Sequence, residues 1–127
     1  MVAMQSNKSI TLYGIPNCDT VKKARVWLQD QDIDFVFHNF KKDGLDRGTI
    51  ENWLSHVDLD LLINRKGTTW RALSDEQKAS CTNRDDAIAL MLASPSVIKR
   101  PVLQINAANA QQVAIGFTPQ LYQPLFK

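Results

Sequence analysis

A strand, a tight turn, a helix and a second strand follow one another within residues 9–38, and this order predicts a βαβ unit. Residues 9–13 (SITLY) form the first expected strand, and Gly14, Pro16 and Asn17 mark the turn after it. A helix is expected from Asp19 to about Gln31, because apolar residues recur on one of its faces: Val21, Ala24 and Leu28. Lysine and arginine occupy the other face. Residues 34–38 (DFVFH) are aromatic and β-branched, which is typical of a strand.

Between residues 39 and 98 the strand signal disappears, and the sequence predicts a helical block. Apolar residues at helical spacing indicate a helix over residues 49–57, and the short apolar segment 58–63 is a candidate for a second one. Ser74 with Gln77 resembles a capping box, and Thr82 with Asp85 resembles a second one that opens a helix over residues 84–93.

Strand signals return near the C-terminus. Residues 102–105 and 112–117 are expected to form an antiparallel hairpin around a turn at residues 106–110. Thr118 is the expected N-cap of a last helix through Leu125, with Pro119 at its first position.

Composition narrows the class of protein. The chain has 127 residues, 44% of them apolar and 22% charged, which is enough for a packed core without disulfide or metal support. A net charge of +2 does not provide the dense basic face of a nucleic-acid-binding protein. No apolar run is long enough to cross a bilayer, and residues 1–9 lack a hydrophobic signal core, so a cytoplasmic protein is expected. The two cysteines and two histidines show no zinc-ligand spacing, so we expect no metal site.

Cys18 is the strongest candidate for chemistry. It follows a strand and a tight turn and stands at the start of the first helix, where unpaired amide groups and the helix dipole stabilise a thiolate. Lys22 and Lys23 add positive potential, and the Thr20 hydroxyl is placed to donate to the sulfur. The alternative is that Cys18 is a small buried apolar residue. Cys81 lacks a preceding strand and turn, so we interpret it as structural, with the role of a resolving thiol as the alternative.

Several motif-based mechanisms do not fit the sequence. Val21 stands where a C-x-x-C motif would need its second cysteine, and Ala24 where a C-x5-R phosphatase loop would need its arginine. Phosphate-binding glycine motifs are absent as well. Arg65, on a polar turn, and Arg100, before Pro101 at a strand entry, are candidates for binding a carboxylate or another oxyanion. Trp27, Trp53 and Trp70 are interpreted as core or groove-wall residues.

Taken together, these residues resemble the arsenate reductase (ArsC)-like branch of the thioredoxin superfamily, most closely its YffB-like members. The resemblance spans residues 10–126, and the segments that carry it are residues 12–20 (LYGIPNCDT), 21–25 (VKKAR), 43–45 (DGL), 64–71 (NRKGTTWR), 98–101 (IKRP) and 116–117 (GF). It implies an α/β, thioredoxin-like fold with a mixed sheet of about four strands. Residues 9–38 and 99–127 would form this core, and residues 39–98 would form an inserted all-helical subdomain.

The resemblance also implies a site. It places a cis-proline at Pro101 beside the active cysteine, and Arg65 and Arg100 match two of three arginines that surround the oxyanion in arsenate reductases of the family. The third would fall near residues 116–117, where this sequence has no arginine. We therefore expect Cys18 as the nucleophile, with anion or substrate binding by Asn17, Thr20, Lys22, Arg65, Arg100 and Pro101.

The function that the resemblance implies, and that these residues suit, is a glutathione-dependent thiol/disulfide reductase with one active cysteine. It would bind no resident cofactor, take glutathione as co-substrate or a glutaredoxin-type thiol as donor, and act as a monomer on a small oxidised or anionic acceptor. Arsenate reduction coupled to glutathione or glutaredoxin is the alternative. A second alternative is an Spx-like regulator that binds RNA polymerase, a group in which a C-x-x-C switch is typical.

Overall fold

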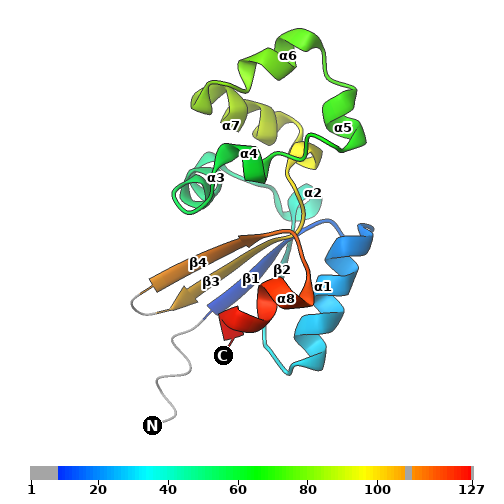
Figure 1. Cartoon of the computed structure of the whole chain (residues 1–127), viewed down its shortest axis with the longest axis vertical. Helices are drawn as coiled ribbons and strands as arrows, with labels where there is room; N and C mark the ends of the chain where they lie inside the picture. The colour runs from blue at the N-terminus through cyan, green and yellow to red at the C-terminus, as the bar shows by residue number, and fades with distance from the viewer. Residues whose placement is uncertain (1–8, 108–109, 127) are drawn as a thin grey trace. The chain divides into compact units, whose positions relative to one another are not determined.

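The computed structural model describes residues 9–107 and 110–126. The chain forms two compact units (Figure 1): residues up to Asp43 and from Arg100 onward make the first, and Gly44–Lys99 make the second. Residues 39–43 therefore go with the first unit and Lys99 with the second, a few residues away from the expected boundaries.

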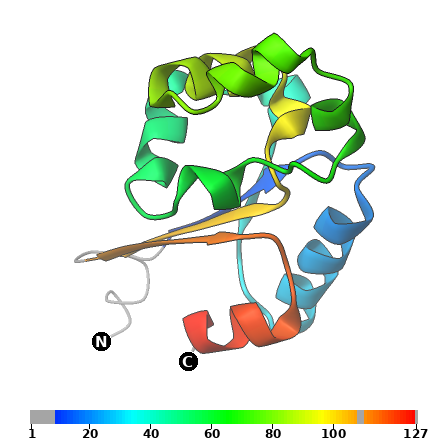
Figure 2. The same cartoon turned by 45° about the horizontal axis from the view of Figure 1, so that its top comes forward.

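The first unit is a mixed four-stranded sheet with helices. Its elements are β1 (Ser9–Gly14), α1 (Asp19–Asp30), β2 (Val36–Asn39), α2 (Phe40–Asp43), β3 (Val102–Ala107), β4 (Ala110–Ile115), α8 (Pro119–Tyr122) and the 3-10 helix η3 (Gln123–Phe126). The strand order is β2-β1-β3-β4. β1 runs parallel to β2 and antiparallel to β3, and β3 and β4 form a hairpin. In Figure 2, α1 and α8 lie on the same side of the sheet. This is the α/β, thioredoxin-like arrangement that the sequence predicts.

The predicted elements differ from the observed ones mainly at their ends. β2 begins at Val36, so residues 34 and 35 of the predicted strand lie outside it. Ala107 and Ala110 already pair with each other, which makes the hairpin turn shorter than predicted, and its residues 108–109 lie outside the described part of the chain, as do residues 1–8. The last α-helix ends at Tyr122 and continues as the 3-10 helix η3 instead of running to Leu125.

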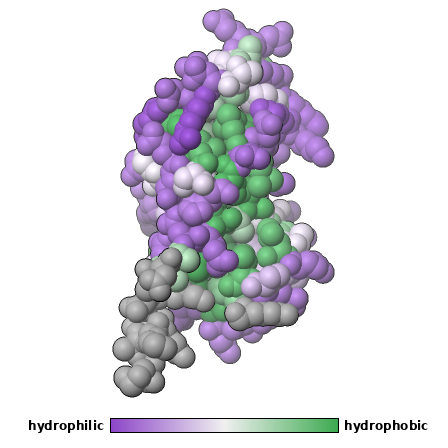
Figure 3. Space-filling view, turned by 60° about the vertical axis from the view of Figure 1, so that its left-hand side comes forward, coloured by the Kyte–Doolittle hydropathy of each residue, from purple (hydrophilic) through white to green (hydrophobic). Residues whose placement is uncertain are grey.

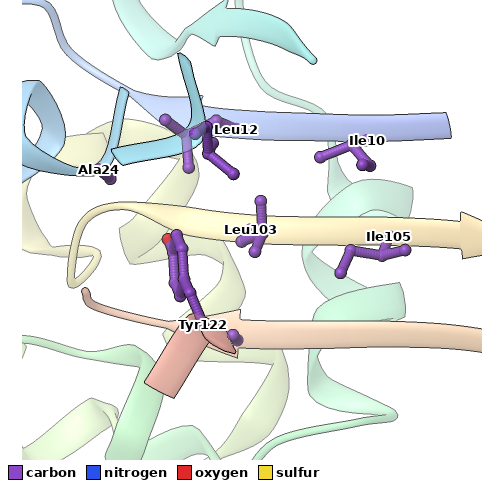
Figure 4. Close-up of a cluster of buried hydrophobic side chains, with 8 residues drawn as sticks. Ile10, Leu12, Ala24, Leu103, Ile105 and Tyr122 are labelled. Carbon is purple, nitrogen blue, oxygen red and sulfur yellow. The ribbon is translucent and has the colours of Figure 1, made fainter. Parts of the chain in front are cut away.

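The core of this unit lies between the sheet and the helices that cover one of its faces. Alternate residues of β1 and β3 point into it because side chains alternate across a strand. Figure 4 shows the cluster, whose buried members are Ile10, Leu12, Ala24, Leu28, Leu103, Ile105, Ala114 and Tyr122. The Tyr122 ring packs edge-on against Phe117 at 4.8 Å and against Trp27 at 5.7 Å between ring centroids. Burial raises the pKa of the Tyr122 hydroxyl, for which the described residues offer no hydrogen-bond partner.

The second unit is helical. Its elements are α3 (Arg47–Leu54), α4 (Leu59–Leu62), α5 (Thr68–Arg71), α6 (Asp75–Ser80), α7 (Arg84–Ala93) and the 3-10 helix η2 (Pro95–Val97). The two ends of the segment from α4 to η2 are joined by backbone hydrogen bonds. The Asn64 amide donates to the Val97 carbonyl at 2.8 Å, and the Lys99 amide donates to the Leu62 carbonyl at 2.7 Å.

Side-chain caps set three of these helix starts. Asp46 caps α3, where its side chain accepts from the Thr49 amide at 2.8 Å. The predicted capping box is confirmed at α6, where Ser74 and Gln77 satisfy each other's backbone amides. The second predicted box is wrong. α7 is capped by Asn83, which accepts from the Asp85 and Asp86 amides, while the Thr82 hydroxyl donates back to the Ala79 carbonyl. A side-chain oxygen one residue further along the chain reaches two free amides, and this position therefore becomes the cap.

On the face that Figure 3 shows, apolar side chains reach the surface among hydrophilic ones. The large apolar side chains with the greatest exposure are Val26, Val36, Leu61 and Leu121.

Candidate functional site

Cys18 lies where β1 turns into α1, and a close contact between Gly14 and Val21 sets this turn. A Cβ atom at Gly14 would lie 2.8 Å from Cγ2 of Val21, so only glycine lets α1 pack this tightly against the end of β1. The Cys18 amide donates to the Ile15 carbonyl at 3.4 Å, and the Cys18 carbonyl accepts from the Lys22 amide at 3.0 Å. Cys18 is therefore the N-cap of α1, the position that the strand–turn–helix pattern predicts.

The Cys18 side chain is half-buried and unbridged, and it makes no capping hydrogen bond of its own. The first amides of the 12-residue helix α1 lack partners within the helix, as at any helix N-terminus, and they lie next to the sulfur in sequence. Thr20 is half-buried two residues further on, and Asn17 and Lys22 are exposed. The surroundings can stabilise negative charge on a nucleophilic sulfur that solvent reaches.

Pro101 lies at the same end of the central strands as the loop that carries Cys18. The register pairs Tyr13 with Val102, so Pro101 is level with Gly14, the last residue of β1. The Arg100–Pro101 peptide bond is cis, as the resemblance implies. The buried Pro101 accepts a hydrogen bond at its carbonyl from the Gly116 amide, at 2.8 Å. Gly116 has a φ of +81°, a left-handed conformation that favours glycine.

Three chain segments therefore meet at this end of the sheet: the turn after β1, the residues before β3 and the residues after β4. They bring Asn17, Cys18, Thr20, Lys22, Arg100 and Pro101 into one unit of the structure. Arg65 belongs to the helical unit, and its grouping with Cys18 stays a prediction.

Arg65 lies in the turn between α4 and α5 and borders a cationic pocket of about 210 Å³. Its Nη1 atom is 2.8 Å from Oδ1 of Asp60, and its guanidinium carbon is 5.4 Å from the centroid of the Trp70 ring. Lys66 and Lys99 also line the pocket. Three cations therefore face one carboxylate, whose side chain is 79% exposed and is thus strongly solvated. The pocket can accept an anion.

Cys81 has the surroundings of a structural cysteine. It is 1% exposed, and its sulfur donates to the Gln77 carbonyl at 3.6 Å. Burial raises the pKa of the Cys81 thiol, and the positive charge of Arg65 only partly opposes this effect.

A groove of about 470 Å³ runs beside α1, and the sequence does not predict it. We call it the α1 groove; its lining residues are Lys22, Lys23, Val26, Trp27 and Asp30 from α1, and Phe117 and Pro119 from the segment after β4. The sequence carries one sign of this groove. Val26 and Trp27 are apolar, although they lie next to the helix face that Lys22 and Lys23 indicate to be exposed to solvent. The opposite wall comes from the other end of the chain, which helical periodicity cannot show.

Over residues 9–107 and 110–126, no three His, Cys, Asp or Glu side chains are grouped so as to hold a metal ion. In the same residues, no helix has both the length and the apolar character that crossing a membrane requires.

Comparison with known proteins adds a family to this geometry. The profile of the ArsC family matches residues 13–125. A solved structure of a protein named YffB superposes with a TM-score of 0.82 at 41% identity, covering 91% of this chain and 97% of that one. An arsenate reductase (ArsC) related protein from Brucella melitensis has a TM-score of 0.69 at 45% identity, covering 94% and 95% of the two chains.

Two curated relatives differ in what is said of them. A protein of Haemophilus influenzae, described only as uncharacterized, is 38% identical over 117 residues, which cover 92% of this chain and 98% of the relative. The global transcriptional regulator Spx of Streptococcus pyogenes is 28% identical over 111 residues, which cover 85% of this chain and 78% of Spx. The family therefore includes both reductase-related proteins and a regulator.

Proposed function

The chain belongs to the ArsC family, and from this premise we propose that it is a glutathione-dependent thiol/disulfide reductase whose nucleophile is Cys18. The observation that carries the proposal is the contrast between its two cysteines. Cys18 is solvent-accessible at the N-terminus of a 12-residue helix. Cys81 is buried, and its sulfur is hydrogen-bonded to the Gln77 carbonyl of the preceding helix. One thiol is therefore available, and the chemistry must be that of a single cysteine.

In the first step the Cys18 thiolate attacks one sulfur of a disulfide acceptor. A bond forms between Cys18 and that sulfur, the acceptor's S–S bond breaks, and the second sulfur leaves as a thiolate that takes a proton from water. The free amides of α1, the Thr20 hydroxyl and the Lys22 ammonium stabilise the attacking sulfur before the step.

In the second step a glutathione thiolate attacks the mixed disulfide and releases Cys18. A second glutathione completes the cycle, so one acceptor disulfide and two glutathione molecules give two thiols and one oxidised glutathione. A glutaredoxin-type thiol can replace glutathione as donor. The reaction needs no resident cofactor, because the electrons come from the co-substrate.

Glutathione carries two carboxylates. Arg100 stands next to Pro101 at the end of the sheet where Cys18 lies, and we assign one carboxylate to it. Arg65 stays a prediction from the sequence for the binding of an anion. Guanidinium groups bind carboxylates through two parallel hydrogen bonds, which orients the ligand as well as holding it. The backbone before Pro101, with Asn17, would contact the peptide part of the ligand.

The test is exposure of the protein to oxidised glutathione at neutral pH, followed by mass spectrometry. We expect one glutathionyl group on Cys18 in the wild-type protein and in the matched control Cys81→Ser, and none in Cys18→Ser. Addition of reduced glutathione should remove the adduct. An unmodified Cys18 after prolonged exposure, or an adduct on Cys81 instead, would contradict the proposal.

Arsenate reduction is the second candidate, and the name of the Brucella relative favours it. Against it, the residues that follow β4 beside Pro101 are Gly116 and Phe117, where the resemblance calls for a third arginine. An assay that couples arsenate to NADPH through glutathione, glutaredoxin and glutathione reductase separates the two candidates. Arsenate-dependent NADPH consumption that Cys18→Ser abolishes would favour arsenate reduction.

A regulatory role like that of Spx has less support in the residues. A C-x-x-C motif that starts at Cys18 would need its second cysteine at position 21. This position is Val21, which is fully buried. Failure of the chain to bind RNA polymerase under conditions where Spx binds it would exclude this role.

A further inference from the structure

We propose that the α1 groove binds the apolar substituent of the disulfide acceptor, and that this acceptor also carries an acidic group. The inference rests on the proposed function and adds a substrate class to it. Its starting point is that the groove and Cys18 share one helix. α1 rises about 1.5 Å per residue, so Lys22 lies about 6 Å and Val26 about 12 Å beyond Cys18 along its axis. The apolar part of an acceptor, together with the linker that joins it to the sulfur, must therefore extend about 12 Å along the helix to reach Val26.

The groove has an apolar floor that is held in place from below. Trp27 and Phe117 line it, and both rings pack against the fully buried Tyr122. Their own centroids are 6.4 Å apart. Phe117 also follows Gly116, whose amide is bonded to the Pro101 carbonyl. The floor is thus fixed to the same end of the sheet as the reactive cysteine. It is formed before any ligand arrives.

One side chain of the groove is apolar without a structural reason. Val26 is 54% exposed, on a helix whose core-facing residues are Val21, Ala24 and Leu28. It contributes little to the core, yet it extends the apolar lining toward solvent. A volume of about 470 Å³ falls in the range of pockets that hold small molecules.

Charge gives the groove a direction. Lys22 and Lys23 lie at the end near Cys18, and Asp30 lies two turns further along the helix. An occupant with an acidic group is attracted to the lysine end and repelled from the other, which brings its sulfur toward Cys18 and its apolar part over Trp27. A neutral or cationic apolar molecule would lack this orientation. The occupant that fits is therefore an aromatic or branched thiol compound with a carboxylate, such as an apolar thiol in mixed disulfide with glutathione.

Binding is tested without thiol chemistry, in a Cys18→Ser background. The ligand is S-(2-naphthylmethyl)glutathione, a thioether that cannot react, and the probe is 8-anilino-1-naphthalenesulfonate, with neutral N-phenyl-1-naphthylamine as its uncharged counterpart. We expect the thioether to displace the sulfonate probe. Val26→Glu should weaken both about tenfold or more, because it puts a negative charge into the apolar lining. Lys23→Glu should weaken the sulfonate probe several-fold more than the neutral one.

Val36→Glu is the matched control, because Val36 is 65% exposed on the edge strand β2 and does not line the groove. It should change neither affinity. Equal affinities in the wild-type, Val26→Glu and Lys23→Glu proteins would overturn the assignment. So would self-association of the protein that Val26→Glu abolishes, since the groove would then be an interface between two copies.

Turnover then separates this inference from the proposed function. The substrates are mixed disulfides of glutathione with 2-naphthylmethanethiol and with 2-mercaptoethanol, two alkyl thiols of comparable leaving ability, compared by kcat/KM. We expect the aromatic substrate to be preferred about tenfold or more, and Val26→Glu to reduce that ratio toward one. Turnover of both substrates at equal kcat/KM would overturn the groove assignment and leave the proposed function standing. The absence of turnover for both substrates would overturn the proposed function, and with it the assignment of an acceptor to the groove.

Discussion

Cys18 and Cys81 differ in solvent access, which helps to govern how fast a thiol reacts. Cys18 is half-buried at a helix N-terminus, and Cys81 is 1% exposed. We predict that iodoacetamide modifies Cys18 of the folded protein at pH 7 at least about tenfold faster than Cys81. Peptide mass spectrometry of samples quenched over time measures both rates in the same molecule.

The pH dependence of the slower reaction follows from burial. Because burial raises the pKa of the Cys81 thiol, less thiolate is present at a given pH than for an exposed cysteine. Labelling of Cys81 should therefore rise only at higher pH, and in concentrated urea the two rates should become similar. A Cys81 that reacts as fast as Cys18 in the folded protein would contradict the assignment of the single active cysteine.

At the scale of single elements, the N-terminus of α7 depends on Asn83. Its side chain accepts from the Asp85 amide at 2.8 Å and from the Asp86 amide at 3.4 Å. Asn83→Ala should lower the free energy of unfolding by about 1 kcal/mol, because both amides lose their partner. Thr82→Ala, the neighbouring control, removes only an exposed bond to the Ala79 carbonyl and should have a smaller effect. Urea denaturation of the two variants measures the difference, and a larger loss in Thr82→Ala would restore Thr82 as the cap.

The contact between β1 and α1 yields a second prediction at this scale. Gly14→Ala would place a methyl group 2.8 Å from Cγ2 of Val21, which is fully buried, and should destabilise the protein by about 1–3 kcal/mol. Val21→Ala should itself cost about 2 kcal/mol through the cavity that it leaves. The double variant should lose less than the sum of the two, because the new methyl group partly fills that cavity. Strict additivity in urea denaturation would show that the two residues do not limit each other.

Helices with repeated periodicity could be predicted from the sequence. One-turn helices could be predicted only where another signal marks them, as an apolar segment does for α4 and the Thr118 cap does for α8. α1 and α7 have 12 and 10 residues, long enough for an apolar face to repeat. α2 and α5 have four residues each, and one turn carries no periodicity. The cap of α7 was predicted one residue too early because Thr82 and Asn83 both suit a cap, and only the path of the backbone decides between them.

The candidate site shows the same division. The location of Cys18 depends on contiguous residues, and a strand, a turn and an amphipathic helix define it in the sequence. The α1 groove depends on Phe117 and Pro119 meeting α1, a contact that only the folded sheet produces. The two arginines expected to bind an oxyanion, Arg65 and Arg100, also come from distant segments of the chain. Of the two, Arg100 shares a unit with Cys18.

At the scale of the whole molecule, chain connectivity couples the two units. The helical unit, Gly44–Lys99, interrupts the sheet unit between α2 and β3. While it is folded, it holds the ends of the interrupted chain at a fixed separation. If it unfolds, the sheet can form only by closing a flexible loop of that length, which costs roughly 3–4 kcal/mol. This coupling acts whatever the surfaces of the two units contribute.

A core substitution in the helical unit should therefore destabilise the sheet as well. Ile88 is fully buried in α7, and Ile88→Ala should cost the helical unit about 2–5 kcal/mol. In native-state hydrogen exchange, the amides of α7 and of β3 should then both exchange faster, those of β3 by up to about several hundredfold where the helical unit is mostly unfolded. Leu61→Ala is the control in the same unit, because Leu61 is 46% exposed, and it should accelerate neither set. If the β3 amides of Ile88→Ala kept the wild-type exchange rate while those of α7 lost their protection, the sheet would be stable without the inserted unit, and the coupling argument would fail.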